Sequence, residues 1–250
     1  MTTGTPRLRM FAGPNGSGKS TLKNVLPAEL LGVYLNADEL EQSIRKHGHI
    51  SVASFGVQPE RILPSHVKDF FRQSSLLKFV GLTSTGDLLS VDSGVIDFSK
   101  VSVNSYVASV LADFLRRCLL HQQASFTMET VMSSVDKVEL LGTALSQGYR
   151  TYLYFVATED PAINVSRVQN RVRMGGHSVP EEKIHSRYHR CLNLLLPAIR
   201  LSNRAFIFDN SADGSDSTWI AEITDGKLIE IKTARIPDWF HRTVMPEVKT

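Results

Sequence analysis

The chain has 250 residues, of which 42% are hydrophobic and 21% are charged. A chain of this length supplies one hydrophobic core of ordinary size and little material for a second, so we expect a single domain over residues 1–250. The formal net charge is only +3, and no run of five or more like charges occurs. This distribution argues against a protein that tracks along nucleic acid and favours a small anionic ligand.

The two cysteines, Cys118 and Cys191, lie in segments whose apolar residues repeat with helical spacing. This spacing predicts positions in the core rather than a disulfide. The sequence has neither the apolar region of a signal peptide nor a run of eighteen apolar residues. We therefore expect a soluble protein of the reducing cytoplasm, with no membrane partner.

The predicted elements follow one another as short apolar runs and longer stretches with helical periodicity. Strands are expected over residues 8–12, 33–35, 126–128, 151–157 and 205–208, and helices from Lys19 to near Pro27 and over residues 107–120, 135–147, 161–174 and 178–196. Three of the helix ends carry specific signals. Gly148 occupies a left-handed C-cap position, Asp160 before Pro161 forms an N-cap, and the spacing from Ser178 to Glu181 is that of a capping box.

Strands separated by helices predict an α/β fold with three layers and a mainly parallel sheet. Two regions depart from this rhythm. Residues 47–100 contain helix-like fragments around 67–79 and a strand pair around 88–96, and we interpret them as a helical insertion over the sheet. Two alternating runs around Asp225-Gly226 predict a C-terminal β-hairpin over residues 217–232.

The most specific motif in the chain is a phosphate-binding loop between the first strand and the helix that follows it. The pattern G-x-x-x-x-G-K-[ST] is met at every fixed position by Gly13-Pro14-Asn15-Gly16-Ser17-Gly18-Lys19-Ser20. Backbone N–H groups and a helix N-terminus would surround the phosphates, Lys19 would contact the β and γ phosphates, and Ser20 would hold Mg²⁺. The residues expected to bind ATP are Gly13, Asn15, Gly16, Ser17, Gly18, Lys19, Ser20 and Thr21.

Candidate residues for the chemistry follow the second and third strands, because strand ends of parallel sheets point into the ligand crevice. Asp38 could accept a proton from an attacking hydroxyl, although with Glu41 it also forms a passable capping box. Glu129 and Thr130 could bind the acceptor or a water on magnesium. The alternative for these two residues is a solvated strand end or a cap for the next helix.

Arginines in the helix after Pro161 resemble a mobile lid that neutralises charge on the transferred phosphoryl group. We expect Arg171 to be catalytic, with further candidates at Arg167, Arg173, Arg187 and Arg190, and a solvated basic face as the alternative. His177 has no metal-ligand spacing and is expected to be an ordinary loop residue. The segment Asp209-Asn210-Ser211 could approach the adenine or ribose, or form a simple turn.

Taken together, these residues resemble the zeta-toxin family of P-loop small-molecule kinases, in particular its bacterial branch of predicted ATPases. The resemblance rests, in order along the chain, on residues 12–21, Asn36-Ala37-Asp38-Glu39, Glu129-Thr130, residues 171–181, Arg187-Tyr188 and Asp209-Asn210-Ser211.

The resemblance implies transfer of the γ-phosphate of ATP to a sugar hydroxyl, with UDP-N-acetylglucosamine as the best-known family substrate. It matches Asp38 to the general base, Lys19 and Ser20 to the nucleotide and magnesium ligands, and Glu129 to a substrate-binding acid. It also implies an antitoxin protein as a candidate partner.

Two alternatives stay open at this point. An aspartate after the second strand also serves kinases of nucleosides or of polynucleotide 5′ ends. A nucleotide-driven switch or transport ATPase shares the loop, but it needs partner motifs that this sequence lacks, since Leu145-Ser146-Gln147-Gly148 matches a transporter signature poorly.

Overall fold

The computed structural model describes residues 4–176, 178–212, 214 and 216–247. The chain divides into two compact units. The first unit consists of Met1–Gly32 with Thr127–Thr250, and the second of Val33–Phe126. The second unit contains the segment 47–100 but begins before it and ends after it. One domain over residues 1–250 with an insertion at 47–100 stays a prediction.

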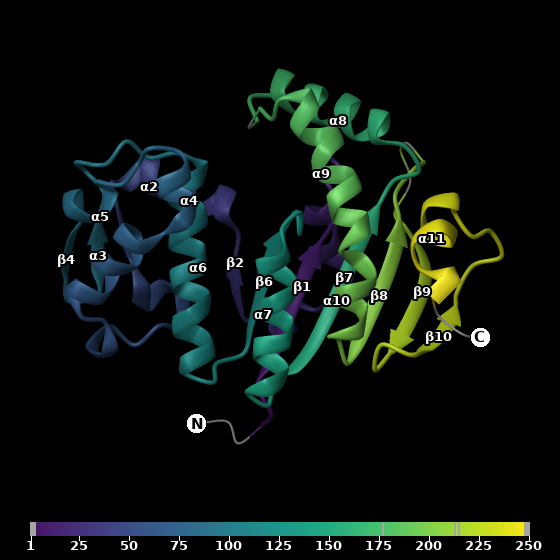
Figure 1. Cartoon of the computed structure of the whole chain (residues 1–250), viewed down its shortest axis with the longest axis horizontal. Helices are drawn as coiled ribbons and strands as arrows, with labels where there is room; N and C mark the ends of the chain where they lie inside the picture. The colour runs from purple at the N-terminus through teal and green to yellow at the C-terminus, as the bar shows by residue number, and fades with distance from the viewer. Residues whose placement is uncertain (1–3, 177, 213, 215, 248–250) are drawn as a thin grey trace. The chain divides into compact units, whose positions relative to one another are not determined.

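The first unit is built on a twisted sheet with the strand order β10-β9-β8-β7-β1-β6 (Figure 1). β7 pairs in parallel with both β1 and β8, whereas β9 runs antiparallel to β8 and to β10. The strands are β1 (Arg7–Ala12), β6 (Phe126–Thr130), β7 (Arg150–Ala157), β8 (Arg204–Asp209), β9 (Thr218–Thr224) and β10 (Leu228–Ile231). The α/β class, the mainly parallel sheet and the C-terminal hairpin are therefore confirmed.

A row of aromatic side chains fixes the register of the central strands. Phe11 on β1 lies opposite Tyr154 on β7, which lies opposite Phe206 on β8. The rings of Phe11 and Tyr154 meet edge to face at 5.1 Å, and those of Tyr154 and Phe206 stack at 4.8 Å. A slip of one residue would send these rings to the opposite face. The carboxyl ends of the three strands are thereby aligned at one edge of the sheet.

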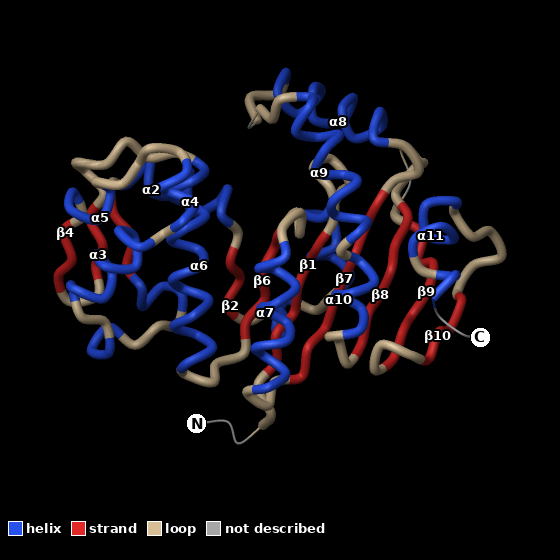
Figure 2. Tube along the Cα trace, viewed as in Figure 1, coloured by secondary structure: helices blue, strands red, loops and turns tan. Residues whose placement is uncertain are grey.

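Helices α7, α9 and α10 lie over one face of this sheet (Figures 1 and 2). The helices of the first unit are η1 (Lys19–Val25), α1 (Ala28–Leu31), α7 (Val135–Ser146), α8 (Pro161–Arg173), α9 (Glu181–Asn193), α10 (Leu195–Arg200), α11 (Asp238–Thr243) and η4 (Met245–Glu247). Two predicted helix ends are confirmed. The side chain of Asp160 accepts a hydrogen bond of 2.7 Å from the Ala162 N–H, and Gly148 is left-handed with φ 82°.

The capping box predicted from Ser178 to Glu181 is wrong. Helix α9 begins at Glu181, and its N-cap is Pro180, with extended backbone and no side-chain hydrogen bond. A residue before proline is driven out of the helical region, so Val179 cannot join the helix and Ser178 lies too far upstream to cap it. The predicted end at Leu196 is also wrong. Pro197 has no N–H, and the chain breaks after Asn193 and restarts as α10, whose first turn tolerates the proline.

The helix predicted after the phosphate-binding loop is instead a 3₁₀ helix, η1, followed by the short helix α1. Thr21 explains the tight first turn, because both its N–H and its hydroxyl donate to the Gly18 carbonyl, at 3.0 and 2.6 Å. The i to i+3 pattern of these bonds is that of a 3₁₀ turn.

The second unit packs helices around a small antiparallel sheet with the order β3-β5-β4. Its long helix α6 buries Val107, Leu111 and Leu115 on one face, as the periodicity predicted. Its elements are β2 (Val33–Leu35), α2 (Ala37–His47), β3 (His49–Ser51), η2 (Val52–Phe55), η3 (Pro59–Arg61), α3 (Pro64–Gln73), α4 (Ser75–Phe79), α5 (Thr85–Leu88), β4 (Ser90–Asp92), β5 (Val95–Asp97) and α6 (Ser105–His121). The expected helical fragments and strand pair of segment 47–100 are present.

Cys118 and Cys191 are both free thiols, as predicted. Cys191 is fully buried in the core, whereas Cys118 is only partly buried. Among the helices of the described residues, none combines the length and the apolar character that crossing a bilayer requires.

Candidate phosphate-binding site

The loop after β1 folds into a tight cradle that only glycine permits at two positions. Gly16 and Gly18 have left-handed backbones, with φ of 76° and 93°. A methyl group on Gly16 would lie 2.5 Å from the main-chain oxygen of Asn164, and one on Gly18 would lie 2.3 Å from Nδ2 of Asn210. The glycines of the motif are thus required both by the backbone conformation and by the close approach of two asparagines.

Lys19 and Ser17 give the cradle the polar character that an anion needs. The Lys19 side chain is largely buried, and its Nζ donates to the Pro14 carbonyl oxygen at 2.9 Å. The Ser17 hydroxyl is buried and has no hydrogen-bond partner among the described residues. Such an orphaned group is costly unless a ligand satisfies it. Ser20 is exposed at the rim. These features fit a phosphate group.

Two asparagines hold the outer side of the loop. Asn164 is fully buried on α8, and its Nδ2 donates to the Asn15 carbonyl oxygen at 2.7 Å. Its Oδ1 accepts from the hydroxyl of Thr158. Asn210, after β8, donates from Nδ2 to the Ser17 carbonyl oxygen at 2.9 Å. Two main-chain carbonyl oxygens of the loop are therefore bonded to side chains from α8 and from the segment after β8.

The sequence patterns predict no role for Thr158 or Asn164. A signal for Asn164 was available, because it lies on the same helical face as Val165 and Val168, which are buried. A polar residue on an apolar helix face needs a partner in the core. The sequence does not show that this partner is the phosphate-binding loop.

The candidate arginines differ in their hydrogen-bond partners. Arg167 donates from its guanidinium to the main-chain oxygens of Asn210 and Ala212, at 2.6 and 3.1 Å, so it ties α8 to the loop after β8. Arg187 on α9 lies at the phosphate-binding loop, where its Nη1 is 3.4 Å from Oδ1 of Asn15.

Arg171 is half-buried near the end of α8, and its main-chain oxygen accepts from the Gly176 N–H at 2.9 Å. Arg173 and Arg190 are exposed, and Arg190 bonds within its own helix. The prediction for His177 lies outside the described residues. Arg187 thus contacts the phosphate-binding loop through the side chain of Asn15.

β6 is the neighbour of β1 in the sheet, and its last residues include two candidate acceptor ligands. Glu129 and Thr130 are half-buried there, and the Thr130 hydroxyl accepts from the Met132 N–H at 3.1 Å, so it also shapes the turn. The Cys191 thiol donates to the Val131 carbonyl oxygen at 2.9 Å. Burial raises the pKa of this thiol, and the charge of Lys19 acts in the opposite direction. The bond from Cys191 thus holds α9 against the chain that follows β6.

Asp38 is exposed at the second position of α2 in the second unit. The alternative reading of Asp38 as the helix cap is wrong. The cap is Asn36, whose side chain accepts from the Asp38 N–H at 2.8 Å. The proton-accepting role of Asp38 stays a prediction, and its carboxylate is not needed to close the helix end.

The segment Asp209-Asn210-Ser211 is a turn that supports the site. The Asp209 carboxylate accepts from the Ser211 hydroxyl at 2.7 Å and from Nε1 of Trp239 at 2.8 Å. These bonds favour the predicted turn for Asp209 and Ser211, and they leave Asn210 free to reach the phosphate-binding loop.

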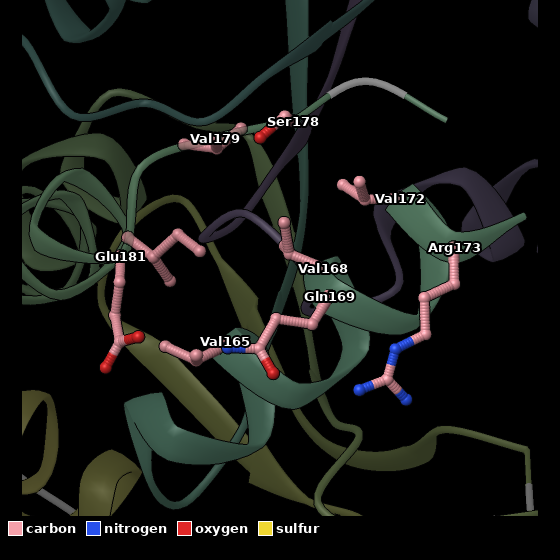
Figure 3. A pocket seen from close by; sticks show the side chains of 9 residues that line it. Val165, Val168, Gln169, Val172, Arg173, Ser178, Val179 and Glu181 are labelled. Atoms are coloured by element: carbon pink, nitrogen blue, oxygen red, sulfur yellow. The ribbon is translucent and has the colours of Figure 1, made fainter. Parts of the chain in front are cut away.

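Helices α8 and α9 form a pair with its own small core. Val165, Val168 and Ile184 are buried between them, with Val179 packed alongside. A cavity of about 320 Å³ opens beside this core (Figure 3), and no residue of the phosphate-binding loop lines it. The two helices therefore pack against each other, and the cavity is separate from the phosphate-binding loop.

No family model matches the chain. Over 69 residues, or 28% of its length, the chain is 29% identical to an uncharacterized protein of Haemophilus influenzae, and the match covers 49% of that protein. Its fold is similar to that of the AvrRxo1-ORF1:AvrRxo1-ORF2 complex, solved with ATP (TM-score 0.55, 16% identity) and with sulphate ions (TM-score 0.53, 15% identity).

Each of these two similarities covers 99% of this chain and 66% of the other. The chain thus spans about half the length of the curated relative and just under two thirds of the solved one. These similarities show a shared fold.

Proposed function

We propose that the protein is an ATP-dependent kinase that transfers the γ-phosphate to a hydroxyl of a small molecule, with a nucleotide sugar such as UDP-N-acetylglucosamine as the first candidate acceptor. The observation that carries this proposal is the glycine cradle after β1, with a largely buried Lys19 and an unsatisfied Ser17 hydroxyl. The solved structure of a similar fold with ATP supports the choice of nucleotide.

The residues of the loop would bind the nucleotide phosphates through their N–H groups and through the ammonium of Lys19. Lys19 now donates to the Pro14 carbonyl, an interaction that a phosphate oxygen can replace because one ammonium has three donors. Ser20 would hold Mg²⁺, which supplies charge neutralisation on the phosphates when bound. Exposure of Ser20 at the rim is consistent with that role.

The acceptor would be bound by Glu129 and Thr130 and deprotonated by Asp38. Thr130 uses an oxygen lone pair for the Met132 N–H, so its own hydroxyl proton remains available to donate. Asp38 is exposed and not engaged as a helix cap, which leaves its carboxylate accessible to an acceptor. A carboxylate there suits a sugar hydroxyl, a nucleoside or a polynucleotide end, so the acceptor must be found by experiment.

Charge on the transferred group would be neutralised by Arg171 and Arg187. We assign this role to Arg171 because the sequence predicts it there. We assign it to Arg187 as well, because its guanidinium reaches Asn15 of the loop. Arg167 is not assigned this role, since its guanidinium is bonded to two main-chain oxygens.

An antitoxin protein is the candidate macromolecular partner. The resemblance to the zeta-toxin family motivates it, and the similar AvrRxo1-ORF1 fold was solved in complex with a second protein, AvrRxo1-ORF2.

The test is incubation of the purified protein with labelled ATP, Mg²⁺ and a panel of nucleotide sugars, nucleosides and oligonucleotides, followed by identification of any phosphorylated product. We expect label on a nucleotide sugar and none with Lys19→Ala. Label on a nucleoside or a 5′ end would favour the other kinases. Steady release of phosphate with no labelled acceptor would contradict the kinase assignment and favour a nucleotide-driven switch.

A further inference from the structure

We propose that Asn164 and Asn210 are positioning residues that hold the phosphate-binding loop in its ATP-receptive shape before the nucleotide arrives. The inference rests on the proposed function and adds to it residues outside the loop motif.

The argument starts from the planarity of the peptide bond. In a trans peptide the C=O of one residue and the N–H of the next point in opposite directions. Asn164 draws the Asn15 carbonyl outward at 2.7 Å, which turns the Gly16 N–H the other way. Asn210 does the same to the Ser17 carbonyl at 2.9 Å, which turns the Gly18 N–H. Both N–H groups belong to the part of the motif that binds phosphate.

The orientation of the Asn164 side chain is fixed by its partners. A carbonyl oxygen only accepts, so the amide nitrogen of Asn164 must face Asn15, and its oxygen then faces the Thr158 hydroxyl, which donates to it. The Tyr188 hydroxyl in turn donates to the Thr158 carbonyl at 2.6 Å. Thr158 and Asn164 are both fully buried, so water does not compete for these bonds.

Asn210 is fixed by its main chain. Its N–H donates to the Ala157 carbonyl at 2.8 Å, and its own carbonyl accepts from Arg167 at 2.6 Å. Arg167 belongs to the same helix, α8, as Asn164. One helix therefore supports both asparagines, directly in one case and through a guanidinium in the other.

A loop that becomes ordered only when the ligand binds lowers the affinity, because part of the binding free energy is used to order it. A loop that already has its bound shape avoids this cost. Once phosphate oxygens occupy the site, they hold the same N–H groups. Loss of either asparagine should therefore raise the dissociation constant for ATP more than it lowers the transfer rate at saturating ATP.

The experiment replaces each amide nitrogen by oxygen, with Asn164→Asp and Asn210→Asp, so that a carboxylate faces a carbonyl. Matched controls make the same change outside the site, at the exposed Asn170 of α8 and at Asn203, which precedes the opposite end of β8. Binding of a non-hydrolysable ATP analogue with Mg²⁺ is measured by calorimetry, well below the melting temperature of each variant.

We expect the dissociation constant to rise about tenfold or more in both site variants, about 1.4 kcal/mol. It should change less than about twofold in Asn170→Asp and Asn203→Asp, because the side chain of Asn170 bonds to Arg173 and that of Asn203 to Thr151 and Asp225, all outside the loop.

A second pair of variants tests the role of Asn164 even if Asn164→Asp does not fold. Thr158→Val keeps the shape of the side chain and removes the donor to Asn164, whereas Thr158→Ser keeps the hydroxyl. We expect Thr158→Val to weaken binding of the analogue several-fold and Thr158→Ser to restore it, whatever their melting temperatures.

Wild-type affinity in Asn210→Asp and Thr158→Val would overturn the positioning role alone. A wild-type protein that does not bind the analogue would overturn the proposed function, and this inference with it.

Discussion

Replacement of Gly16 by alanine tests the geometry of the phosphate-binding loop most directly. With φ of 76°, an alanine here pays the left-handed cost of about 1–2 kcal/mol. Its methyl group would also lie 2.5 Å from the main-chain oxygen of Asn164 and 3.1 Å from its Cα. These atoms are backbone of α8 and cannot swing aside, so overpacking adds about 1–3 kcal/mol. We expect the free energy of unfolding to fall by roughly 2–5 kcal/mol.

Gly148 supplies the control. It has nearly the same backbone, with φ of 82°, but an added methyl group would meet no atom within 4 Å. Gly148→Ala should therefore cost only the left-handed term of about 1–2 kcal/mol and should leave ATP binding unchanged. The difference between the two variants isolates the contact of the loop with Asn164.

Urea denaturation gives the free energies of unfolding, and calorimetry at a temperature where both variants are folded gives the affinity for an ATP analogue. Relief of the clash requires the loop and α8 to move apart, which lengthens the bond from Asn164 to Asn15, so Gly16→Ala should bind at least about tenfold more weakly. Equal destabilisation of the two variants together with wild-type affinity in Gly16→Ala would refute this reasoning.

Lys19→Ala should weaken ATP binding and abolish transfer without unfolding the protein, because its ammonium serves the phosphates; wild-type affinity and turnover would contradict the loop assignment. Asp38→Asn should lower acceptor phosphorylation by about 10² to 10⁴ with near-normal ATP affinity and melting temperature, since Asn36 caps α2. Unchanged phosphorylation, or a loss explained by unfolding, would exclude the base role. Burial raises the pKa of the Cys118 thiol from 9.0 to about 11, so the folded protein keeps a proton that the unfolded chain releases. The free energy of unfolding should be fully retained below pH 9 and fall between pH 9 and 11, and Cys118→Ala should show a smaller fall in urea titrations; equal falls would contradict the burial effect.

Most of the secondary-structure features that the sequence predicts correctly depend on short stretches of consecutive residues. The cap at Asp160, the left-handed Gly148 and the hairpin at Asp225-Gly226 each depend on a few consecutive residues, and each is present. The errors have local causes as well. Pro180 overrode the capping box at Ser178, and Asn36 rather than Asp38 took the helix cap. In both cases two neighbouring residues favoured different helix starts. The backbone restriction before Pro180 decided the first case, and the side chain of Asn36 decided the second.

The sequence by itself determined the α/β class, the strand-to-helix position of the phosphate-binding loop and the identity of Lys19 and Ser20 within it, because these follow from periodicity and from a contiguous motif. Only the tertiary structure decided what supports the loop. Asn164 and Asn15 are 149 residues apart, and Asn210 and Ser17 are 193 apart. A hydrogen bond between such residues forms only when the register of β1, β7 and β8 brings their ends to one edge of the sheet, and no local pattern encodes which carbonyl an asparagine will reach.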